Sequence, residues 1–583
     1  METVSADVAI VGAGGAGLRA ALALAEAAPK LRIALISKVY PMRSHTCAAE
    51  GGAAGVIKPG DSLAQHFEDT VGGGDWLCDQ DAVEYFIGEA PKELLQLERW
   101  GCPWSREPDG SVAVRPFGGM KRMRTWFAAD KSGFHILHTL FQTSLKYESI
   151  RRFDEYYVTD LLVEDGRCRG LTAIEMRSGQ MRQIDAAAVI LAGGGAGRMF
   201  PFTTNGAIKT GDAMALAYRA GVPLKDMEFV QYHPTGLPST GTLLTEACRG
   251  EGGVLLNKNG RRFLQDYGMG PETPLGHPVL KTMELGPRDR VSQAFWHEQR
   301  KGNALTTRWG DAMLLDMRHL GEKTINERLP LVRDMSISYM GVDPVSDPVP
   351  VRPVVHYMMG GIHTDTEAAT SLAGLFAAGE CACVSINGAN RLGSNSLTEL
   401  LVFGRRAALS AIEFVENNQA RPVSARLAED AQGRIRELMQ RTGGAETVAG
   451  LRRQMMRIME EHAGIYRNGE GLAAACARLG ELRRRYRNLE LHDRTNVYNT
   501  DLLQALELGA MLDCAEAVVQ SAAARKESRG AHQRLDFPER DDRNFLRHTL
   551  AIHAADGPPR IGYRDVVITR SQPGVRDYSG AHA

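Results

Sequence analysis

The chain has 583 residues, of which 43% are hydrophobic and 24% are charged, proportions typical of a soluble globular protein with several domains. Its formal net charge is -1, whereas a nucleic-acid-binding protein is expected to be strongly basic. No apolar run approaches the roughly 20 residues of a membrane-spanning helix, and the first residues lack the basic segment of a secretory signal, so we expect neither.

The cysteines argue against a disulfide framework. There are nine of them, an odd number, and none shows C-x-x-C spacing; Cys381 and Cys383 are the closest pair. We therefore expect a reduced compartment that faces the cytosol, and no zinc or iron–sulfur site built from this chain. Any iron–sulfur cluster on an electron path through this protein has to be held by another polypeptide.

The first predicted elements form a β-α-β unit: a buried strand, a glycine-rich turn, an alanine-rich helix and a second strand, at residues 8–11, 12–17, 18–28 and 32–36. Two later apolar runs, at residues 187–191 and 374–378, also lead into glycine. The pattern predicts a parallel sheet assembled from segments that lie far apart in the chain.

The composition changes further along the chain. Residues 235–352 are rich in glycine, proline and charge, which fits an inserted domain. From about residue 404 the pattern is typical of long helices, and it is clearest over residues 500–525, where apolar residues recur at helical spacing. The stretch after residue 541 is polar, and we expect it to be irregular.

The glycine-rich turn has the G-x-G-x-x-G pattern at Gly12, Gly14 and Gly17, with Ala13, Gly15 and Ala16 between them. Between a strand and a helix, this pattern favours a dinucleotide whose pyrophosphate lies at the helix N-terminus, over a simple tight turn. The second strand departs from the general pattern, since it ends in Ser37 and Lys38 where an acidic residue usually binds the ribose. The turn alone does not identify the dinucleotide.

The segment at residues 40–52 identifies the dinucleotide through its resemblance to a known family. It contains Ser44, His45, Thr46 and Glu50, followed by Gly51 and Gly52, and it resembles the covalent-flavin loop of the fumarate reductase and succinate dehydrogenase flavoprotein family. The resemblance implies that His45 carries FAD through the 8α carbon of the flavin. A neutral imidazole is a suitable nucleophile for that carbon.

The resemblance runs from about residue 6 to residue 563 and is strongest to the flavoproteins of membrane-bound bacterial quinol:fumarate reductases. It implies an α/β fold: a Rossmann-like FAD-binding domain with an inserted α+β capping domain, a helical domain and an irregular C-terminal segment. The expected boundaries are 1–234 and 353–415 for the two parts of the FAD-binding domain, 235–352 for the capping domain, 416–540 for the helical domain and 541–583 for the last segment.

Further cofactor contacts follow from the resemblance by position. Val158 and Asp212 match residues on the adenine and ribose side, although Asp212 could also cap a helix. The second flavin-binding segment of the family matches Glu380, Arg391, Ser394, Ser396 and Leu397, and His356 also belongs to this group.

The resemblance also implies a dicarboxylate site. His233, Thr245, His356 and Arg391 match the clamp on the two carboxylates, and an arginine can hold one of them bidentately. A lone arginine is usually a solvated surface charge, and a lone histidine is usually structural. If the match had no functional meaning, these ordinary roles would have to apply to every matching segment at once.

The proton for the second carbon is assigned by the family to an arginine that matches Arg288, supplied through Glu246 and Arg249. A guanidinium with a pKa above roughly 12 is a poor acid. It works only if the proton moves to a strongly basic centre and is replaced at once. A second cation beside it would favour its deprotonation.

The direction of reaction and the partners are implied in the same way. Glu50 matches the reductase type of the family, whereas the dehydrogenase type tends to carry glutamine there. We expect fumarate reduction in anaerobic respiration, with electrons from an iron–sulfur subunit on membrane anchors, at the cytoplasmic face of the inner membrane.

Alternatives stay open from the sequence. The enzyme could work as a succinate dehydrogenase or resemble soluble L-aspartate oxidase, which holds FAD without a covalent bond. A flavin electron carrier would not need the arginines and histidines of the clamp. An RNA-modifying flavoprotein would be expected to show a basic face, which the net charge of -1 does not support.

Overall fold

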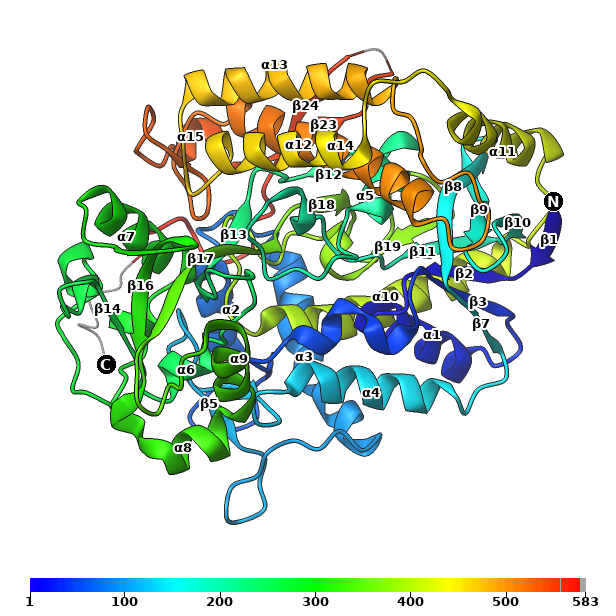
Figure 1. Cartoon of the computed structure of the whole chain (residues 1–583). Helices are drawn as coiled ribbons and strands as arrows, with labels where there is room; N and C mark the ends of the chain where they lie inside the picture. The colour runs from blue at the N-terminus through cyan, green and yellow to red at the C-terminus, as the bar shows by residue number, and fades with distance from the viewer. Residues whose placement is uncertain (556, 577–583) are drawn as a thin grey trace.

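The computed structural model describes residues 1–555 and 557–576. A parallel five-stranded sheet in the order β19-β11-β2-β3-β7 lies at the centre of the fold (Figure 1). Its strands are Leu375–Ala377, Ala188–Leu191, Val8–Val11, Ile33–Ser37 and Ile150–Asp154. The first four are the predicted strands, and the fifth, β7, was not predicted.

The two faces of this sheet are buried in different ways, which explains why its strands are apolar throughout. Val8 and Ile10 point into a core shared with α1 (Gly15–Ala27), α4 (Ser132–Ser144) and α10 (Asn395–Asn417). The alternate residues, Ala9 and Val11, pack into a second core on the opposite face.

Helix α1 begins three residues before the predicted start, at Gly15, so its first turn lies inside the glycine motif. This places the N–H groups at the start of the helix next to the turn.

Two further sheets flank the centre. One has the order β1-β10-β9-β8, with strands Glu2–Ser5, Gln180–Asp185, Arg167–Glu175 and Tyr156–Glu164. The other has the order β20-β18-β12-β23-β24, with strands Ala382–Cys383, Gly361–His363, Leu224–Lys225, Arg547–Ile552 and Arg560–Asp565.

The last segment corrects an expectation. The stretch after residue 541 was expected to be irregular, but it holds α15 (Asp542–Phe545) and the antiparallel pair β23 and β24. Strand β23 pairs with β12 of the FAD-binding part, and β24 is the outer strand with mostly exposed residues. The polar composition of this outer hairpin concealed its strand pattern. Residues 577–583 lie outside the described residues.

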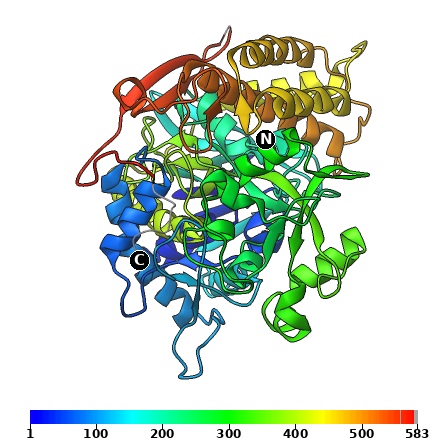
Figure 2. The ribbon, with the colours of Figure 1, turned by 90° about the vertical axis from the view of Figure 1, so that its left-hand side faces the viewer.

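A separate hydrophobic core occupies the middle of the chain, with buried residues from Leu237 to Val351. Its sheet has the order β13-β17-β16-β14, formed by Val230–Gly236, Val349–Met358, Gly310–Asp316 and Val254–Leu256, and β15 (Leu305–Thr307) pairs with β16. Its helices are α6 (Ala247–Gly250), α7 (Arg288–Arg300), α8 (Gly321–Arg328) and α9 (Pro330–Met340). Figure 2 shows these green segments projecting beside the rest of the molecule.

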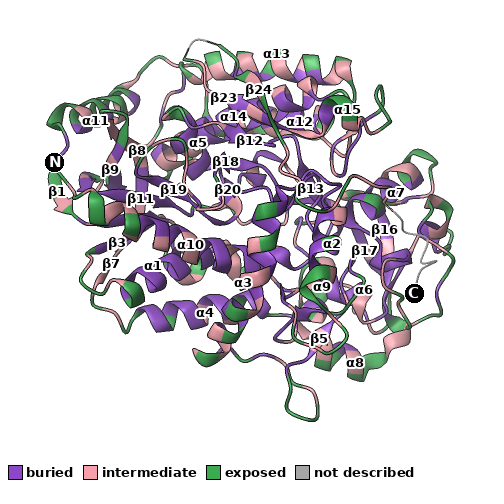
Figure 3. Cartoon of the chain, turned by 180° about the vertical axis from the view of Figure 1, so that it is seen from behind, coloured by how far each residue is buried: buried purple, intermediate pink, exposed green. Residues whose placement is uncertain are grey.

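The helical part consists of α11 (Ala425–Gln440), α12 (Val448–His462), α13 (Gly469–Tyr486) and α14 (Thr500–Ala524). Helix α14 confirms the helix predicted over residues 500–525, and its start is capped by Asn499, whose side chain accepts the N–H of Leu502 at 2.8 Å. Figure 3 shows α14 largely buried, while α11 and α13 carry exposed faces.

The remaining described elements connect these parts: β4 (Ala53–Ala54), β5 (Val114–Arg115), β6 (Thr125–Trp126), β21 (Tyr466–Arg467), β22 (Gln533–Arg534), α2 (Leu63–Gly73), α3 (Gln80–Arg99), α5 (Asp212–Arg219), and the short 3-10 helices η1 (Pro41–Arg43), η2 (His45–Ala48), η3 (Gly197–Met199), η4 (Phe263–Tyr267), η5 (Met283–Leu285), η6 (Arg318–Leu320) and η7 (Gly379–Cys381). Within residues 1–555 and 557–576, no helix is both long enough and apolar enough to cross a membrane.

Candidate active site

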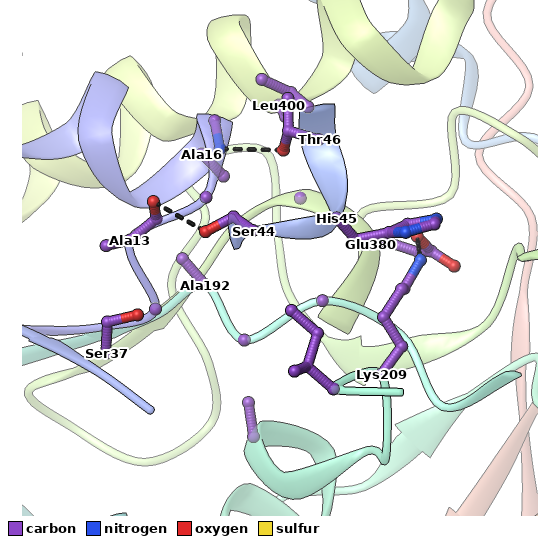
Figure 4. A pocket seen from close by; sticks show the side chains of 18 of the residues that line it. Ala13, Ala16, Ser37, Ser44, His45, Thr46, Ala192, Lys209, Glu380 and Leu400 are labelled. Atoms are coloured by element: carbon purple, nitrogen blue, oxygen red, sulfur yellow. Dashed lines mark hydrogen bonds and ion pairs between the residues drawn. The ribbon is translucent and has the colours of Figure 1, made fainter. Parts of the chain in front are cut away.

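A cavity opens at the carboxyl ends of β2, β11 and β19, where the crevice of a doubly wound sheet binds its ligand (Figure 4). It is lined by the glycine-rich turn after β2, the loop of η1 and η2, and the segments that follow β11 and β19. The start of α10 and the region around α5 complete its wall. The lining therefore comes from parts of the chain that only the parallel sheet brings together.

The glycines of the turn are required by close packing. Gly12 has φ +109°, and a Cβ there would collide with the carbonyl oxygen of Ala192. A Cβ at Gly17 would collide with the carbonyl oxygen of Gly12. Gly17 thus keeps α1 close to the turn and does not belong to the cavity lining itself.

The loop that carries His45 is fixed to this turn on both sides. The Ser44 hydroxyl donates to the carbonyl of Ala13 at 3.1 Å, and the N–H of Gly15 donates to Oγ1 of Thr46 at 3.1 Å (Figure 4). His45 lies between these anchors and lines the cavity.

The His45 ring is neutral. Desolvation, together with the positive charge of Lys209, holds the pKa of His45 well below its usual value. Its Nδ1 accepts the backbone N–H of Gly206 at 3.2 Å, which places the ring proton on Nε2. A neutral, oriented imidazole is the form that nucleophilic chemistry requires.

Lys38 follows directly after β3, where the general dinucleotide-binding pattern has an acidic residue. Its ammonium donates to Asp212 at 2.5 Å, to Glu507 at 2.7 Å and to Thr210 at 2.8 Å. Burial lowers the pKa of Lys38, but the two carboxylates outweigh this and raise it above its usual value. Lys38 therefore joins the cavity wall to helix α14.

Asp212 also accepts from the Tyr157 hydroxyl at 3.3 Å. It is the first residue of α5, and the capping position is Gly211, so the alternative role of Asp212 as the cap is not what the structure shows.

Most of the predicted cofactor residues line this cavity: Gly12, Ala13, Gly14, Gly15, Ala16, Ser37, Lys38, Ser44, His45, Thr46, Val158, Asp212, His356, Glu380, Ser396 and Leu397. Of the other predicted residues, Gly17, Glu50, Gly51, Gly52, Arg391 and Ser394 lie outside the described lining. Ser394 precedes α10 in the left-handed conformation, with φ 65°, and its carbonyl accepts the N–H of Ala54.

Glu50 connects the flavin loop to the predicted clamp. Its Oε2 accepts the backbone N–H of Thr245 at 3.1 Å. Burial, with Asp130 nearby, raises the pKa of Glu50 well above its ordinary 4.5. A negative charge at Glu50 therefore appears only above that raised pKa. The guanidinium of Arg115 holds the carbonyls of Glu50 and Gly51.

Two histidines from neighbouring strands face one another next to the cavity. The ring centroids of His233, on β13, and His356, on β17, are 5.1 Å apart. Nδ1 of His233 accepts the N–H of Thr235 at 3.2 Å, and Nδ1 of His356 lies 2.8 Å from the Thr204 hydroxyl. Desolvation, with Arg288 as the next cause, holds the pKa of both rings well below the usual value. Both rings are neutral.

Two buried arginines converge on one glutamine in the same region. Oε1 of Gln231 accepts from Arg288 Nη1 at 3.2 Å and from Arg391 Nη2 at 3.1 Å. Burial, reinforced by the charge of Arg288, lowers the pKa of Arg391 to about 10. Arg391 also lies over the Tyr357 ring, 4.4 Å from its centroid, and donates to Ser396 at 3.1 Å.

The three residues of the predicted proton relay lie next to one another in the structure. Arg288 Nε donates to Glu246 Oε2 at 2.7 Å, and Arg249 Nη2 lies 3.8 Å from the same oxygen. Burial raises the pKa of Glu246, but the two arginines outweigh it and leave the pKa below 4.5. The other oxygen of Glu246 accepts the N–H of Gly118. Burial lowers the pKa of Arg249 from its ordinary 12.5.

The comparisons with known proteins agree along the whole chain. A family model described as an FAD binding domain matches residues 7–397, and a fumarate reductase flavoprotein C-terminal model matches residues 452–578. A fumarate reductase flavoprotein subunit from Serratia sp. is 59% identical, covering 100% of this chain and 98% of that protein. The chain belongs to the fumarate reductase flavoprotein family.

Other members of the family and of its neighbours agree with this assignment. The FrdA chain of Escherichia coli quinol fumarate reductase superposes with a TM-score of 0.98 at 58% identity and covers 100% of both chains. A succinate dehydrogenase flavoprotein subunit from Rickettsia bellii is 43% identical over 97% of this chain and 95% of that protein. The predicted fold class and the predicted resemblance are confirmed.

Several residues of this flavoprotein site were not among those predicted. Gln231 lies two residues before the predicted His233, but its bridge between two arginines could not be inferred from the local sequence. Lys209 lines the cavity and pairs with Glu380. Thr204 orients His356. The sequence signal that could have pointed to Lys209 as a site residue is its position as a lysine in an otherwise apolar stretch that contains glycine.

Proposed function

We propose that this protein interconverts fumarate and succinate by exchanging a hydride with FAD bound covalently to His45, and that it works mainly as a fumarate reductase. Support for FAD comes from the family model and from the cavity. Support for the substrate comes from one observation above all: neutral His233 and His356 and the cations Arg288 and Arg391 converge beside the cavity. The higher identity to fumarate reductase flavoproteins supports the reductive direction.

The residues around the cavity fit FAD. The turn after β2 presents backbone without side chains at the start of α1, which suits a pyrophosphate. Lys38 and Asp212 stand at one end of the lining, and His45 and His356 belong to it as well. When bound there, FAD would accept or donate the hydride.

We propose that His45 forms the bond to the flavin. Its ring is neutral, its loop is tied to the turn by Ser44 and Thr46, and the contact from Gly206 fixes its orientation. The proton assigned to Nε2 must leave when that nitrogen forms the bond.

We propose that His233, Thr245, His356 and Arg391 hold the two carboxylates. Nδ1 of His233 is held by the backbone of Thr235, 3.2 Å from both its N–H and its carbonyl oxygen, so Nε2 is the ring nitrogen left for a substrate carboxylate. Arg391 has a buried Nε without a hydrogen-bond partner among the described residues, so it retains a donor for a carboxylate. Donors fixed before the substrate arrives stabilise the charge that builds up as hydride adds to the alkene.

We propose that Arg288 gives a proton to the other carbon. Its guanidinium is hydrogen-bonded to Glu246, which lies within reach of Arg249, so the lost proton can be replaced along a buried path. Arg249 has two buried nitrogens, Nε and Nη2, without a hydrogen-bond partner in the described part of the chain. Burial and the charge of Arg288 both lower the pKa of Arg249, so Arg249 gives up a proton more readily.

The partners follow from the relatives. The solved chains that this protein resembles belong to quinol fumarate reductase. We infer that electrons reach the flavin from a separate iron–sulfur subunit, and that membrane anchor subunits hold this assembly at the cytoplasmic face of the inner membrane. All nine cysteines of this chain are free thiols, seven of them are buried, and none belongs to the described cavity lining.

The domain boundaries 1–234, 235–352, 353–415, 416–540 and 541–583 stay our proposal for the organisation of the chain. The separate core between Leu237 and Val351 supports the capping domain. Strands β13 and β17 cross from it toward the FAD-binding part and carry His233 and His356, so the site lies at the junction of the two.

The test is paired turnover with the purified complex. Fumarate-dependent oxidation of a reduced viologen and succinate-dependent reduction of a dye are both expected, with the first faster. Aspartate is the control, because an L-aspartate oxidase would turn it over. A preparation with covalent flavin that is inactive toward both four-carbon acids would contradict the proposed substrate.

A further inference from the structure

A buried ion pair forms part of the cavity wall beside His45. The ammonium of Lys209 pairs with Oε2 of Glu380, and both residues line the cavity (Figure 4). Lys209 is 4% exposed, so its charge is not screened by bulk water.

The backbone around the pair leaves it little freedom. A Cβ at Gly195 would lie 2.5 Å from Oε1 of Glu380, so the carboxylate packs directly against this glycine. The same oxygen accepts the N–H of Met358 at 3.3 Å. Lys209 runs past Gly194, whose hypothetical Cβ would be 3.6 Å from Cε of the lysine. Each carboxylate oxygen therefore has a partner, and Lys209 provides the only positive charge among these contacts in the described residues.

The loop that carries Lys209 also contacts His45. The N–H of Lys209 donates to the carbonyl of Gly206 at 3.1 Å, and the N–H of Gly206 donates to His45 Nδ1 at 3.2 Å. The charge pair and the proposed attachment residue are thus held by one short turn. Figure 4 shows the Lys209 side chain directed toward Glu380 and His45.

We propose that Lys209 is a positioning residue that keeps Glu380 in place and offsets its negative charge beside the flavin, and so sustains the reduction potential of the cofactor. This rests on the proposed binding of FAD at His45. Reduction adds electron density to the flavin, so an uncompensated carboxylate in the same enclosed cavity opposes it. Without the lysine, Glu380 loses the cation that is directly paired with it, and only the more distant Arg391 is left to offset its charge.

The experiment is a spectroelectrochemical titration of the flavin in the full-length holoenzyme. Lys209→Met is expected to disfavour reduction at least about tenfold at pH 8, a fall of about 30 mV for a two-electron couple. Lys209→Arg keeps the charge and is expected to stay close to wild type.

A double-mutant cycle tests whether Lys209 acts through Glu380. The potentials of Glu380→Gln and Lys209→Met/Glu380→Gln are expected to be nearly equal at pH 8. No carboxylate is left to offset, and burial lowers the pKa of Lys209 further once Glu380 no longer raises it, so the lysine gives up its charge. Lys225→Met is the matched control: it also removes a buried lysine, next to Asp79, but it lies outside the cavity lining among the described residues. An unchanged potential in Lys209→Met, or an equal fall in the Glu380→Gln background, overturns the proposal.

Measuring the flavin content of each variant tests the proposal even if a variant binds FAD poorly. If Lys209→Met takes up little FAD, then Lys209→Arg and the double variant are expected to restore the flavin per chain, and failure of the double variant to do so overturns the proposal. The potential is measured without fumarate. A wild-type enzyme that carries flavin but does not reduce fumarate would refute the proposed function alone, whereas a wild type that takes up no FAD would refute both.

Discussion

The glutamine between the two site arginines offers a sharp test of how the substrate clamp is positioned. In Gln231→Leu the side chain keeps a similar size but loses its polar atoms. Wild-type Oε1 accepts from Arg288 at 3.2 Å and from Arg391 at 3.1 Å, while Nε2 donates to Asn390 at 2.9 Å and to the Arg391 carbonyl at 2.7 Å. The substitution therefore releases both guanidiniums at once.

The expected magnitude follows from these contacts. Hydrogen bonds to a charged group contribute about 1.5–3 kcal/mol each. If the transition state loses the equivalent of one to two of them, the barrier rises by about 2.7 kcal/mol, which lowers kcat/KM for fumarate about 100-fold. A displacement of a positioned group by about 1 Å has an effect of the same order.

The assay is fumarate-dependent viologen oxidation, normalised to flavin content. Gln231 lies outside the described lining of the FAD cavity, so covalent flavin per chain is expected to stay at the wild-type level. The matched control is Gln183→Leu, a buried glutamine of β10 whose amide donates to Asp185 at 2.7 Å, far from the clamp. Normal kcat/KM in a fully flavinylated Gln231→Leu enzyme would refute the view that this residue positions both arginines.

Three further outcomes are expected. Arg288→Gln, which breaks the 2.7 Å contact with Glu246, should lower fumarate turnover by about 10²–10⁴-fold with flavin retained; near-normal turnover would exclude Arg288 as the acid. In His45→Ser the flavin should leave the protein on acid precipitation, whereas it stays in the wild-type pellet; acid-stable flavin in the variant would place the attachment elsewhere. His548→Gln should reduce stability by about 3–5 kcal/mol, since His548 lies 3.0 Å from Asp79 and 2.6 Å from Asp226 in the interior. Burial lowers the pKa of His548, but the two carboxylates outweigh it and raise it above 6.5, so this stability is complete below pH 6.5 and disappears as the pH rises through the folded value. Thermal unfolding over a pH series, with exposed His492→Gln as the control, measures it, and equal pH profiles for wild type and variant would contradict the assignment.

Local pattern was sufficient for the elements with strong periodicity. The β-α-β unit at the start was predictable because apolar strands and a glycine-rich turn are encoded within about thirty residues. Helix α14 was predictable for the same reason, since its apolar spacing and its Asn499 cap are local. The pairing of distant strands β11 and β19 was inferred from similar apolar runs that each lead into glycine.

Elements defined by distant partners were not predictable in this way. Strand β7 contains Arg151 and Arg152 and reads as polar, because it is the edge of the sheet and pairs only with β3. The hairpin of β23 and β24 is strand-like because β12 lies beside it, and that strand is more than 300 residues away in sequence.

In the candidate site too, locally encoded features could be predicted and features that depend on distant segments could not. Its residue types could be proposed by resemblance, because motifs such as the one around His45 are contiguous. Their contacts could not, since they depend on side chains from separate segments. Lys38 is the clearest case: its partners Asp212 and Glu507 lie in α5 and α14, and the local sequence suggested only a missing acid.

The FAD cavity is built from segments that lie far apart in the chain, and this has a consequence for biosynthesis. The lining of the FAD cavity runs from Val11 to Leu400, so the ribosome must make 400 of the 583 residues before the binding site exists. At roughly 5–20 residues per second, this takes about 20–80 s. For that time the glycine-rich turn and the His45 loop are present without the walls that complete the cavity. Binding of FAD in this cavity therefore reports that the polypeptide has been translated and folded at least into α10.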